Sequence, residues 1–220
     1  MRFIFSVFLL VIVSEVSAQS EFQHWYSAEC SGDIIKRLDW SFELNSRFDN
    51  YGMRSFFPQA GIEYKINDLL KAGIDYRFIS ERNNVNNYEI SNRININLNA
   101  KKKLAKRLYG SIRMRYQFGF KDVSSFGYDP DFDPAIRIKP KLEYDIKNFP
   151  FSPVIGTEFF FNPNRNSYES GLSKIRTEIG VQYEGFKKQE LGIKYLFERR
   201  FTDQTFLWRH IISVSYSYKL

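Results

Sequence analysis

Few side chains in this sequence could carry acid-base catalysis. Histidine occurs only at His24 and His210, and cysteine only at Cys30. A serine hydrolase needs a histidine close to the serine that it activates, and a membrane phospholipase would place that serine two residues after His210, where Ile212 stands. Ser213 would lie on the opposite face of a strand. We therefore predict no catalytic residue, and a membrane-embedded, lipid-acting hydrolase with His210 as its base is kept as an alternative.

A second set of candidates is a long series of charged side chains. They recur at every second position of apolar segments, and in β-strands such positions share one face. The charged face would hold Glu43, Arg47, Asp75, Arg77, Glu89, Arg93, Arg113, Arg115, Arg137, Lys139, Glu143, Glu158, Arg176, Glu178, Glu198 and Arg200. One hypothesis is a network of cross-strand ion pairs that fills and rigidifies a barrel. The other is a water-filled path whose excess of arginine favours anions.

Three aspartates, Asp129, Asp131 and Asp133, have the spacing that opens a calcium-binding loop. Pro134 stands where such a loop needs its turning glycine, and Pro140 stands where it needs a bidentate glutamate, so we expect no EF-hand. These aspartates remain weak candidates for a loose metal site. No cofactor is predicted, because the chain has neither a zinc-ligand spacing nor a glycine-rich phosphate loop.

The start of the chain has the pattern of an export signal. A basic Met1-Arg2 precedes the apolar run Phe3–Val13, and the small residues of Val16-Ser17-Ala18 suit a cleavage site. We expect residues 1–18 to be a cleaved signal peptide and residues 19–220 to form one outer-membrane β-barrel domain. Cys30 is the only cysteine, so no internal disulfide can form.

The elements that would position the charged residues are strands with alternating polarity. Residues 38–49 show the unit, with Leu38, Trp40 and Phe42 in one phase and Asp39, Ser41 and Glu43 in the other. Ten such segments follow one another from residue 38, and residues 22–31 are an eleventh candidate. Because bacterial barrels of this kind have even strand numbers, we expect ten or twelve strands. After the signal, no apolar run approaches the roughly 20 residues of a membrane helix.

Strand number indicates which face points outward. Eight strands already enclose an interior that side chains just fill, and ten or more enclose a wider lumen. Roughly fifty large apolar and aromatic side chains would not fit inside, so the charged face should line the lumen. The predicted class is therefore an all-β, antiparallel, up-and-down transmembrane β-barrel of 10–12 strands with a charged lumen. Pro140 lies within a predicted strand and demands a bulge or an edge.

The predicted connections are of two kinds that alternate along the chain. Short basic ones lie near residues 67, 101–107, 147–152 and 185–189, and longer polar ones near 80–87, 122–134 and 162–171. This is the asymmetry of an outer-membrane barrel, with short periplasmic turns and longer outer loops. Export makes nucleic acid an implausible partner for the basic run 101–107, and phosphate-rich lipid headgroups fit it better.

Several short motifs resemble one family. They are Trp25, the strand Glu43-Leu-Asn-Ser-Arg47-Phe48, Gly73-Ile-Asp-Tyr76-Arg77, Arg93, Arg113-Met-Arg115-Tyr116, Glu158-Phe-Phe and a closing Tyr216-x-Tyr218. The chain is similar, over nearly all of its mature length, to the bacterial outer-membrane proteins grouped as domain of unknown function 2490. The resemblance implies a β-barrel in the outer membrane of a Gram-negative cell and brings no known activity or catalytic residues.

We thus expect a monomeric, non-catalytic outer-membrane β-barrel, either structural or a narrow porin-like channel with an arginine-rich lumen. A lipid-acting hydrolase and a protein that binds ligands through its surface loops are the alternatives. The expected partners are outer-membrane lipids, lipopolysaccharide and the barrel-assembly machinery, with no nucleic acid.

Overall fold

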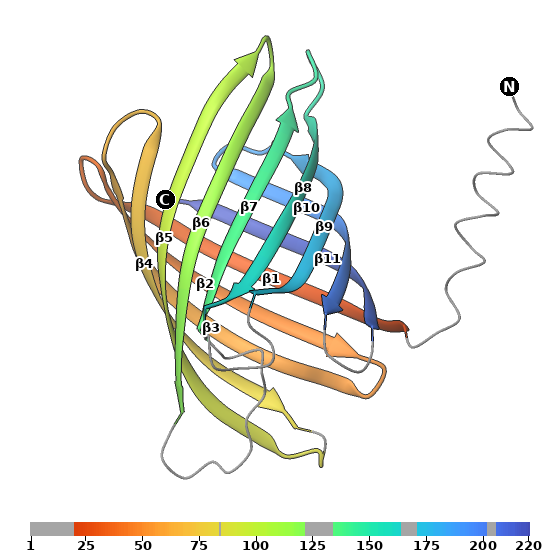
Figure 1. Cartoon of the computed structure of the whole chain (residues 1–220). Helices are drawn as coiled ribbons and strands as arrows, with labels where there is room; N and C mark the ends of the chain where they lie inside the picture. Colours follow the sequence, from red (N-terminus) through yellow and green to blue (C-terminus); the bar gives the residue numbers. More distant parts are fainter. Residues whose placement is uncertain (1–19, 84, 122–133, 164–170, 202–205) are drawn as a thin grey trace, which may run out of the picture.

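The chain forms a single closed barrel of eleven strands (Figure 1). The computed structural model describes residues 20–83, 85–121, 134–163, 171–201 and 206–220. The strands are β1 (Ser20–Ile35), β2 (Leu38–Asp49), β3 (Gly52–Lys65), β4 (Leu70–Arg82), β5 (Tyr88–Ala105), β6 (Leu108–Lys121), β7 (Ala135–Tyr144), β8 (Phe151–Asn162), β9 (Gly171–Tyr183), β10 (Gln189–Phe201) and β11 (Phe206–Lys219). The all-β barrel class and its range of 10–12 strands are confirmed.

The expectation of an even strand number is wrong. Neighbouring strands are antiparallel from β1 to β11, so an odd number gives the first and last strand the same direction. The barrel closes through a parallel pairing of these two strands, from Ser20 opposite Trp208 to Ser31 opposite Lys219. The segment 22–31, whose role the sequence did not decide, belongs to β1, where it pairs with β11 throughout and with β2 from His24 onward. Pairing of β1 with β11 leaves the sheet without an exposed edge. The barrel can therefore close with an odd number of strands, because a parallel pair satisfies both edges.

Successive connections alternate between two ends of the barrel. The turn end carries residues 36–37, 66–69, 106–107, 145–150 and 184–188, and the loop end carries residues 50–51 and 85–87. The predicted short basic connections and the predicted loop 80–87 therefore lie at opposite ends. The predicted connections 122–134 and 162–171 fall largely outside the described residues.

The predicted connector 101–107 is wrong in extent, because β5 continues to Ala105 and turns only at Lys106-Arg107. The hairpin of β5 and β6 projects beyond its neighbours at the turn end (Figure 1). The side chains of residues 101–106 are exposed. Alternating polarity is expected only where the two faces of a strand have different surroundings. Here both faces are exposed, so the alternating pattern ends before the strand does.

Polarity is inverted across the barrel wall. Buried polar side chains belong to the inward phase, including Gln23, Gln59, Asn95, Asn97, Arg115, Glu158, Arg176, Glu198 and Arg209. Large apolar side chains of the other phase are exposed, including Phe42, Ile62, Ile74, Ile96, Met114, Phe118, Ile155, Ile179 and Ile193. Among the described residues, no helix has the length and apolarity needed to cross a membrane.

Pro140 interrupts the wall between β7 and β8. Ladder pairs run from Ile136 to Ile138 and resume at Lys141 opposite Gly156, and the positions between them are unpaired on that side. On the β6 side, Pro140 keeps its register opposite Ile112. The predicted irregularity is therefore present, and its cause is the missing N–H of proline.

Candidate functional site

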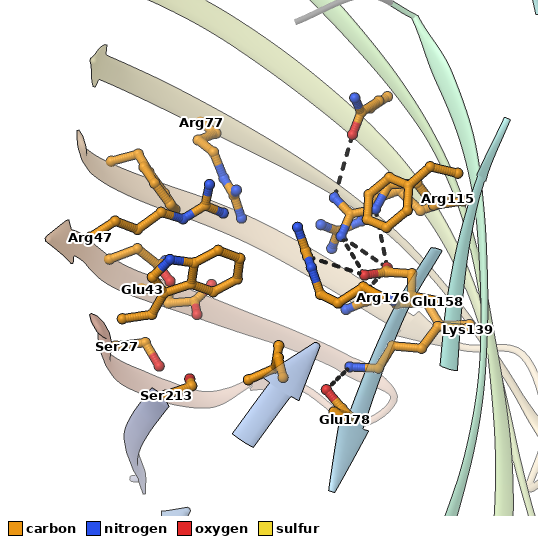
Figure 2. Close-up of a pocket in the computed structure, with 18 of the residues that line it drawn as sticks. Ser27, Glu43, Arg47, Arg77, Arg115, Lys139, Glu158, Arg176, Glu178 and Ser213 are labelled. Atoms are coloured by element: carbon orange, nitrogen blue, oxygen red, sulfur yellow. Dashed lines mark hydrogen bonds and ion pairs between the residues drawn. The ribbon is translucent and has the colours of Figure 1, made fainter. Parts of the chain in front are cut away.

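A cavity of about 590 Å³ lies inside the barrel. Its volume falls in the range of small-molecule sites, roughly 300–1,000 Å³. Among the described residues that line it, eleven are arginine or lysine and six are glutamate. Figure 2 shows Arg47 and Arg77 on one side of this cavity and Arg115, Glu158 and Lys139 on the other. The lining that the described residues give this cavity is therefore cationic.

Twelve of the sixteen predicted interior residues line the cavity. They are Glu43, Arg47, Arg77, Arg93, Arg113, Arg115, Arg137, Lys139, Glu158, Arg176, Glu178 and Arg200. Asp75 and Glu198 are buried beside it. Glu89 lies near the loop end, where it accepts a hydrogen bond from Asn83 at 2.9 Å. Glu143 lies near the turn end with Lys101 and Lys141. The last two residues belong to the ends of the barrel.

One side of the interior carries a ladder of alternating charge. Glu158 on β8 faces Arg176 on β9, which faces Glu198 on β10, then Arg209 on β11 and Glu21 on β1. The guanidinium of Arg176 lies 2.5 Å from Glu198, and that of Arg209 lies 2.9 Å from Glu198 and 2.8 Å from Glu21. Opposite charges on facing strands stabilise a sheet, so this ladder fills and fixes one wall.

The other side places like charges opposite each other. Arg77 faces Arg93 across β4 and β5, and Arg115 faces Arg137 across β6 and β7. Directly opposed like charges destabilise a sheet. The carboxylates supplied to this wall are few: Asp75 accepts from Arg115 at 3.2 Å, and Glu158 lies 2.9 Å from Arg137. Among the described residues, this wall therefore carries more positive than negative charge.

Glu158 is shared by three arginines. Its carboxylate lies 2.9 Å from Arg113, 2.9 Å from Arg137 and 3.5 Å from Arg176, and the residue is only 3% exposed. Two carboxylate oxygens can hold two guanidinium forks well. Some N–H groups of the third guanidinium therefore have no acceptor on Glu158. Nε of Arg113 is buried without a hydrogen-bond partner among the described residues.

Three inward aromatic rings join the arginines into a continuous stack. Phe57 lies between Arg77 and Arg47, with guanidinium-to-ring distances of 4.6 and 4.7 Å. Trp25 lies between Arg47 at 3.9 Å and Arg176 at 4.7 Å. Phe160 continues the stack from Arg176 at 5.0 Å to Arg137 at 4.5 Å. We call these seven residues, Arg77, Phe57, Arg47, Trp25, Arg176, Phe160 and Arg137, the arginine–aromatic belt.

The belt crosses the lumen instead of following the wall. Trp25 is on β1 and Arg176 is on β9, and the strands β11 and β10 separate them in the sheet. The indole N–H of Trp25 donates to Gln23 at 2.8 Å, which fixes the ring. Stacking occupies the faces of the guanidinium groups and leaves their N–H edges for acceptors.

Sequence reasoning missed the belt aromatics. Trp25 served only the family resemblance, and Phe57 and Phe160 occupy the charged phase of their strands with no role predicted for them. A large aromatic residue in the polar phase, such as Phe57 between Ser55 and Gln59, is the signal that could have identified them. The contact between Trp25 and Arg176, however, depends on the closure of the barrel.

Of the remaining candidates, only His210 belongs to the described residues, and it does not line the cavity. His210 is on the outward face, where Nδ1 lies 2.5 Å from the hydroxyl of Tyr195. The weak metal candidates Asp129, Asp131 and Asp133 lie outside the described residues. No cluster of His, Cys, Asp or Glu able to hold a metal occurs within the described residues.

Basic side chains at the turn end differ in how they are compensated. Lys65 lies 2.7 Å from Asp68, and this contact holds the pKa of the Asp68 carboxyl below its usual value. Lys101 lies 3.1 Å from Glu143. Within the described part of the chain, Lys102 and Lys106 have no carboxylate partner. The tip of the projecting hairpin therefore presents free positive charge.

The closed sheet, its charged interior and its apolar exterior define a β-barrel of inverted polarity. The model of the family described as "Protein of unknown function (DUF2490)" matches residues 22–209, and the chain belongs to this family. No curated protein matches the chain significantly. The family resemblance noted in the sequence is thereby confirmed.

Proposed function

We propose that this protein is a non-catalytic β-barrel of the bacterial outer membrane whose interior is a narrow, porin-like path that favours anions. The observation that carries the proposal is the inverted polarity of the wall. An apolar exterior of this extent is unfavourable in water and suits lipid. In bacteria, closed barrels with an apolar exterior span the outer membrane, and the export signal predicted for residues 1–18 agrees with that location.

The preference for anions follows from the lining. Rings of arginine and lysine select anions in pores, and cations outnumber carboxylates around the cavity. The alternating ladder on β8 to β11 supports the second possibility, that the interior is filled and the barrel is structural. The exposed lysines of the β5–β6 hairpin would meet the phosphates of lipid headgroups at the membrane surface.

Conductance of the pure, refolded protein in a planar bilayer tests the proposal. We expect small, well-defined current steps and a reversal potential in a salt gradient that indicates anion preference. The folded protein should also migrate differently in a gel before and after boiling. Cation-selective current contradicts the preference, and unchanged migration together with recovery in the soluble fraction contradicts the membrane barrel. A silent but heat-modifiable barrel favours the structural role.

The alternative of a lipid-acting hydrolase has its own test. We expect the wild type and the His210→Ala variant to release fatty acid from phospholipid esters at the same background rate. The reason is that His210 has Tyr195 as its hydrogen-bond partner and that, within the described part of the chain, it makes no hydrogen bond to a serine hydroxyl. Hydrolysis by the wild type that His210→Ala abolishes would restore the enzyme hypothesis. Ligand binding by the surface loops depends mainly on residues outside the described part of the chain.

A further inference from the structure

The β4–β7 wall brings several arginines together with few carboxylates among the described residues. Arg77 is 9% exposed and lines the cavity. Its Nε donates to the neutral side chain of Gln59 at 2.8 Å, and its face covers Phe57. Among the described residues, no carboxylate lies within ion-pair distance of Arg77. A buried guanidinium without a carboxylate is costly, and this one also faces Arg93 across the sheet.

The carboxylates near Arg77 already have other partners. Asp75 accepts from both Asn97 at 2.7 Å and Arg115 at 3.2 Å. Glu158 is already shared by three arginines. The donors left over point toward one cavity, because Arg77, Arg113, Arg115 and Arg137 all line it. A counter-anion in the cavity would relieve the repulsion between the opposed arginines.

The form of these donors indicates the kind of anion. A guanidinium is a planar fork that binds two oxygens of a carboxylate or a phosphate at once. Two opposed forks are bridged best by a tetrahedral oxyanion with more than one negative charge, and a phosphate group carries about −1.5 to −2 at pH 7. Stacking on Phe57 holds Arg77 with its edge toward the cavity, so little side-chain entropy is lost when the anion binds.

We propose that the cavity is a binding site for a phosphate group, held by Arg77 together with Arg93, Arg115 and Arg137 and framed by the arginine–aromatic belt. The site takes inorganic phosphate or the phosphate of a small ester. The proposal names a ligand for the anion path described above, and the role of the site in the cell rests on that proposed function. Binding itself is independent of conduction, so the two can fail separately.

The test uses the full-length barrel refolded in detergent, with Trp40 and Trp208 replaced by phenylalanine so that Trp25 is the only tryptophan and can be excited selectively. Titration with inorganic phosphate at constant ionic strength should change the Trp25 emission saturably, and calorimetry should give the same Kd. Loss of one charge-assisted hydrogen-bonding group costs roughly 1.5–3 kcal/mol, so Arg77→Gln should weaken binding by about tenfold to a hundredfold.

The matched control is Arg54→Gln, which removes the same charge near the loop end at a residue that does not line the cavity. We expect its Kd to stay within about twofold of the wild type, as screened distant charges contribute little. Arg77→Lys keeps the charge and loses the fork, and it should fall between the wild type and Arg77→Gln. Heat-modifiable migration of each variant shows that it has folded.

Absence of saturable phosphate binding, or equal Kd values for the wild type and both Arg77 variants, overturns the site. Glycerol 3-phosphate should compete with inorganic phosphate. If competition comes only from micelles that contain phosphatidic acid, the anion binds at the lipid surface and the interior site is wrong. Anion current without phosphate binding overturns the site and leaves the channel, whereas phosphate binding without current supports the site and removes the channel.

Discussion

Replacing Ile96 by arginine is expected to lower the free energy of unfolding from lipid vesicles by about 2–4 kcal/mol. Ile96 lies near the middle of β5, on the outward face, between Ile74 and Tyr116 on the neighbouring strands. It is 55% exposed in the barrel. If that exposure is to lipid, the guanidinium must enter hydrocarbon at the midplane, where its desolvation is most costly.

Leu104→Arg provides the matched control for this prediction. Leu104 is on the same strand and is 57% exposed, but it lies at the turn end, one residue before β5 ends at Ala105. We expect it to change stability by less than about 0.5 kcal/mol, as surface substitutions in water usually do. Denaturant titration of both variants in phospholipid vesicles gives the comparison. Equal, small effects at both positions would mean that water surrounds Ile96 and that the barrel is not embedded.

Replacing Glu198 by glutamine is expected to destabilise the barrel by about 3–5 kcal/mol. Glu198 is fully buried, at 0% exposure, and its carboxylate lies 2.5 Å from Arg176, 2.9 Å from Arg209 and 3.1 Å from Arg200. Glutamine preserves the shape and removes the negative charge that these three guanidinium groups share. An uncompensated buried charge costs more than the pair contributed.

Glu43→Gln makes the same chemical change at a residue with the opposite surroundings. Glu43 faces Glu29 across β1 and β2, and no ion pair to Glu43 occurs among the described residues. Removing one of two opposed carboxylates relieves repulsion, so we expect a change between zero and a stabilisation of about 1 kcal/mol. Unfolding in urea, followed by the difference in mobility between folded and unfolded protein, measures both variants. Equal losses of stability in the two variants would show that stability depends on the total interior charge and not on the specific ion pairs of the ladder.

The sequence alone was sufficient to place the strands whose two faces differ in polarity. Alternating polarity with a period of two identified residues 38–49, which coincide with β2, and assigned Glu158 and Arg176 to the inward phase. This information is local, because the side-chain period of a strand is two wherever the strand lies. The pattern failed where the two faces of a strand have the same surroundings. Residues 101–105 form a strand that is exposed on both faces, so their polarity does not alternate.

What only the tertiary structure decided is which inward residues meet. Phase places Arg77, Arg93 and Glu43 inside, but the register between strands decides that Arg77 faces Arg93 and that Glu43 faces Glu29. Register and the stagger of a closed sheet are collective properties, since each strand is fixed by two neighbours. A set of inward charges that looks like a uniform ion-pair network is therefore divided into a compensated wall and a cationic wall.

The odd strand number and the arginine–aromatic belt both result from the parallel pairing of β1 with β11. An even count follows from antiparallel closure, and nothing in the local pattern of residues 20–35 says that they also pair in parallel with β11. That closure places Trp25 within reach of Arg176, 151 positions later in the chain. The sequence thus determined a barrel with charges inside and apolar residues outside. Only the closed sheet, which sets distances across the lumen, determined how those charges are balanced and where an anion would fit.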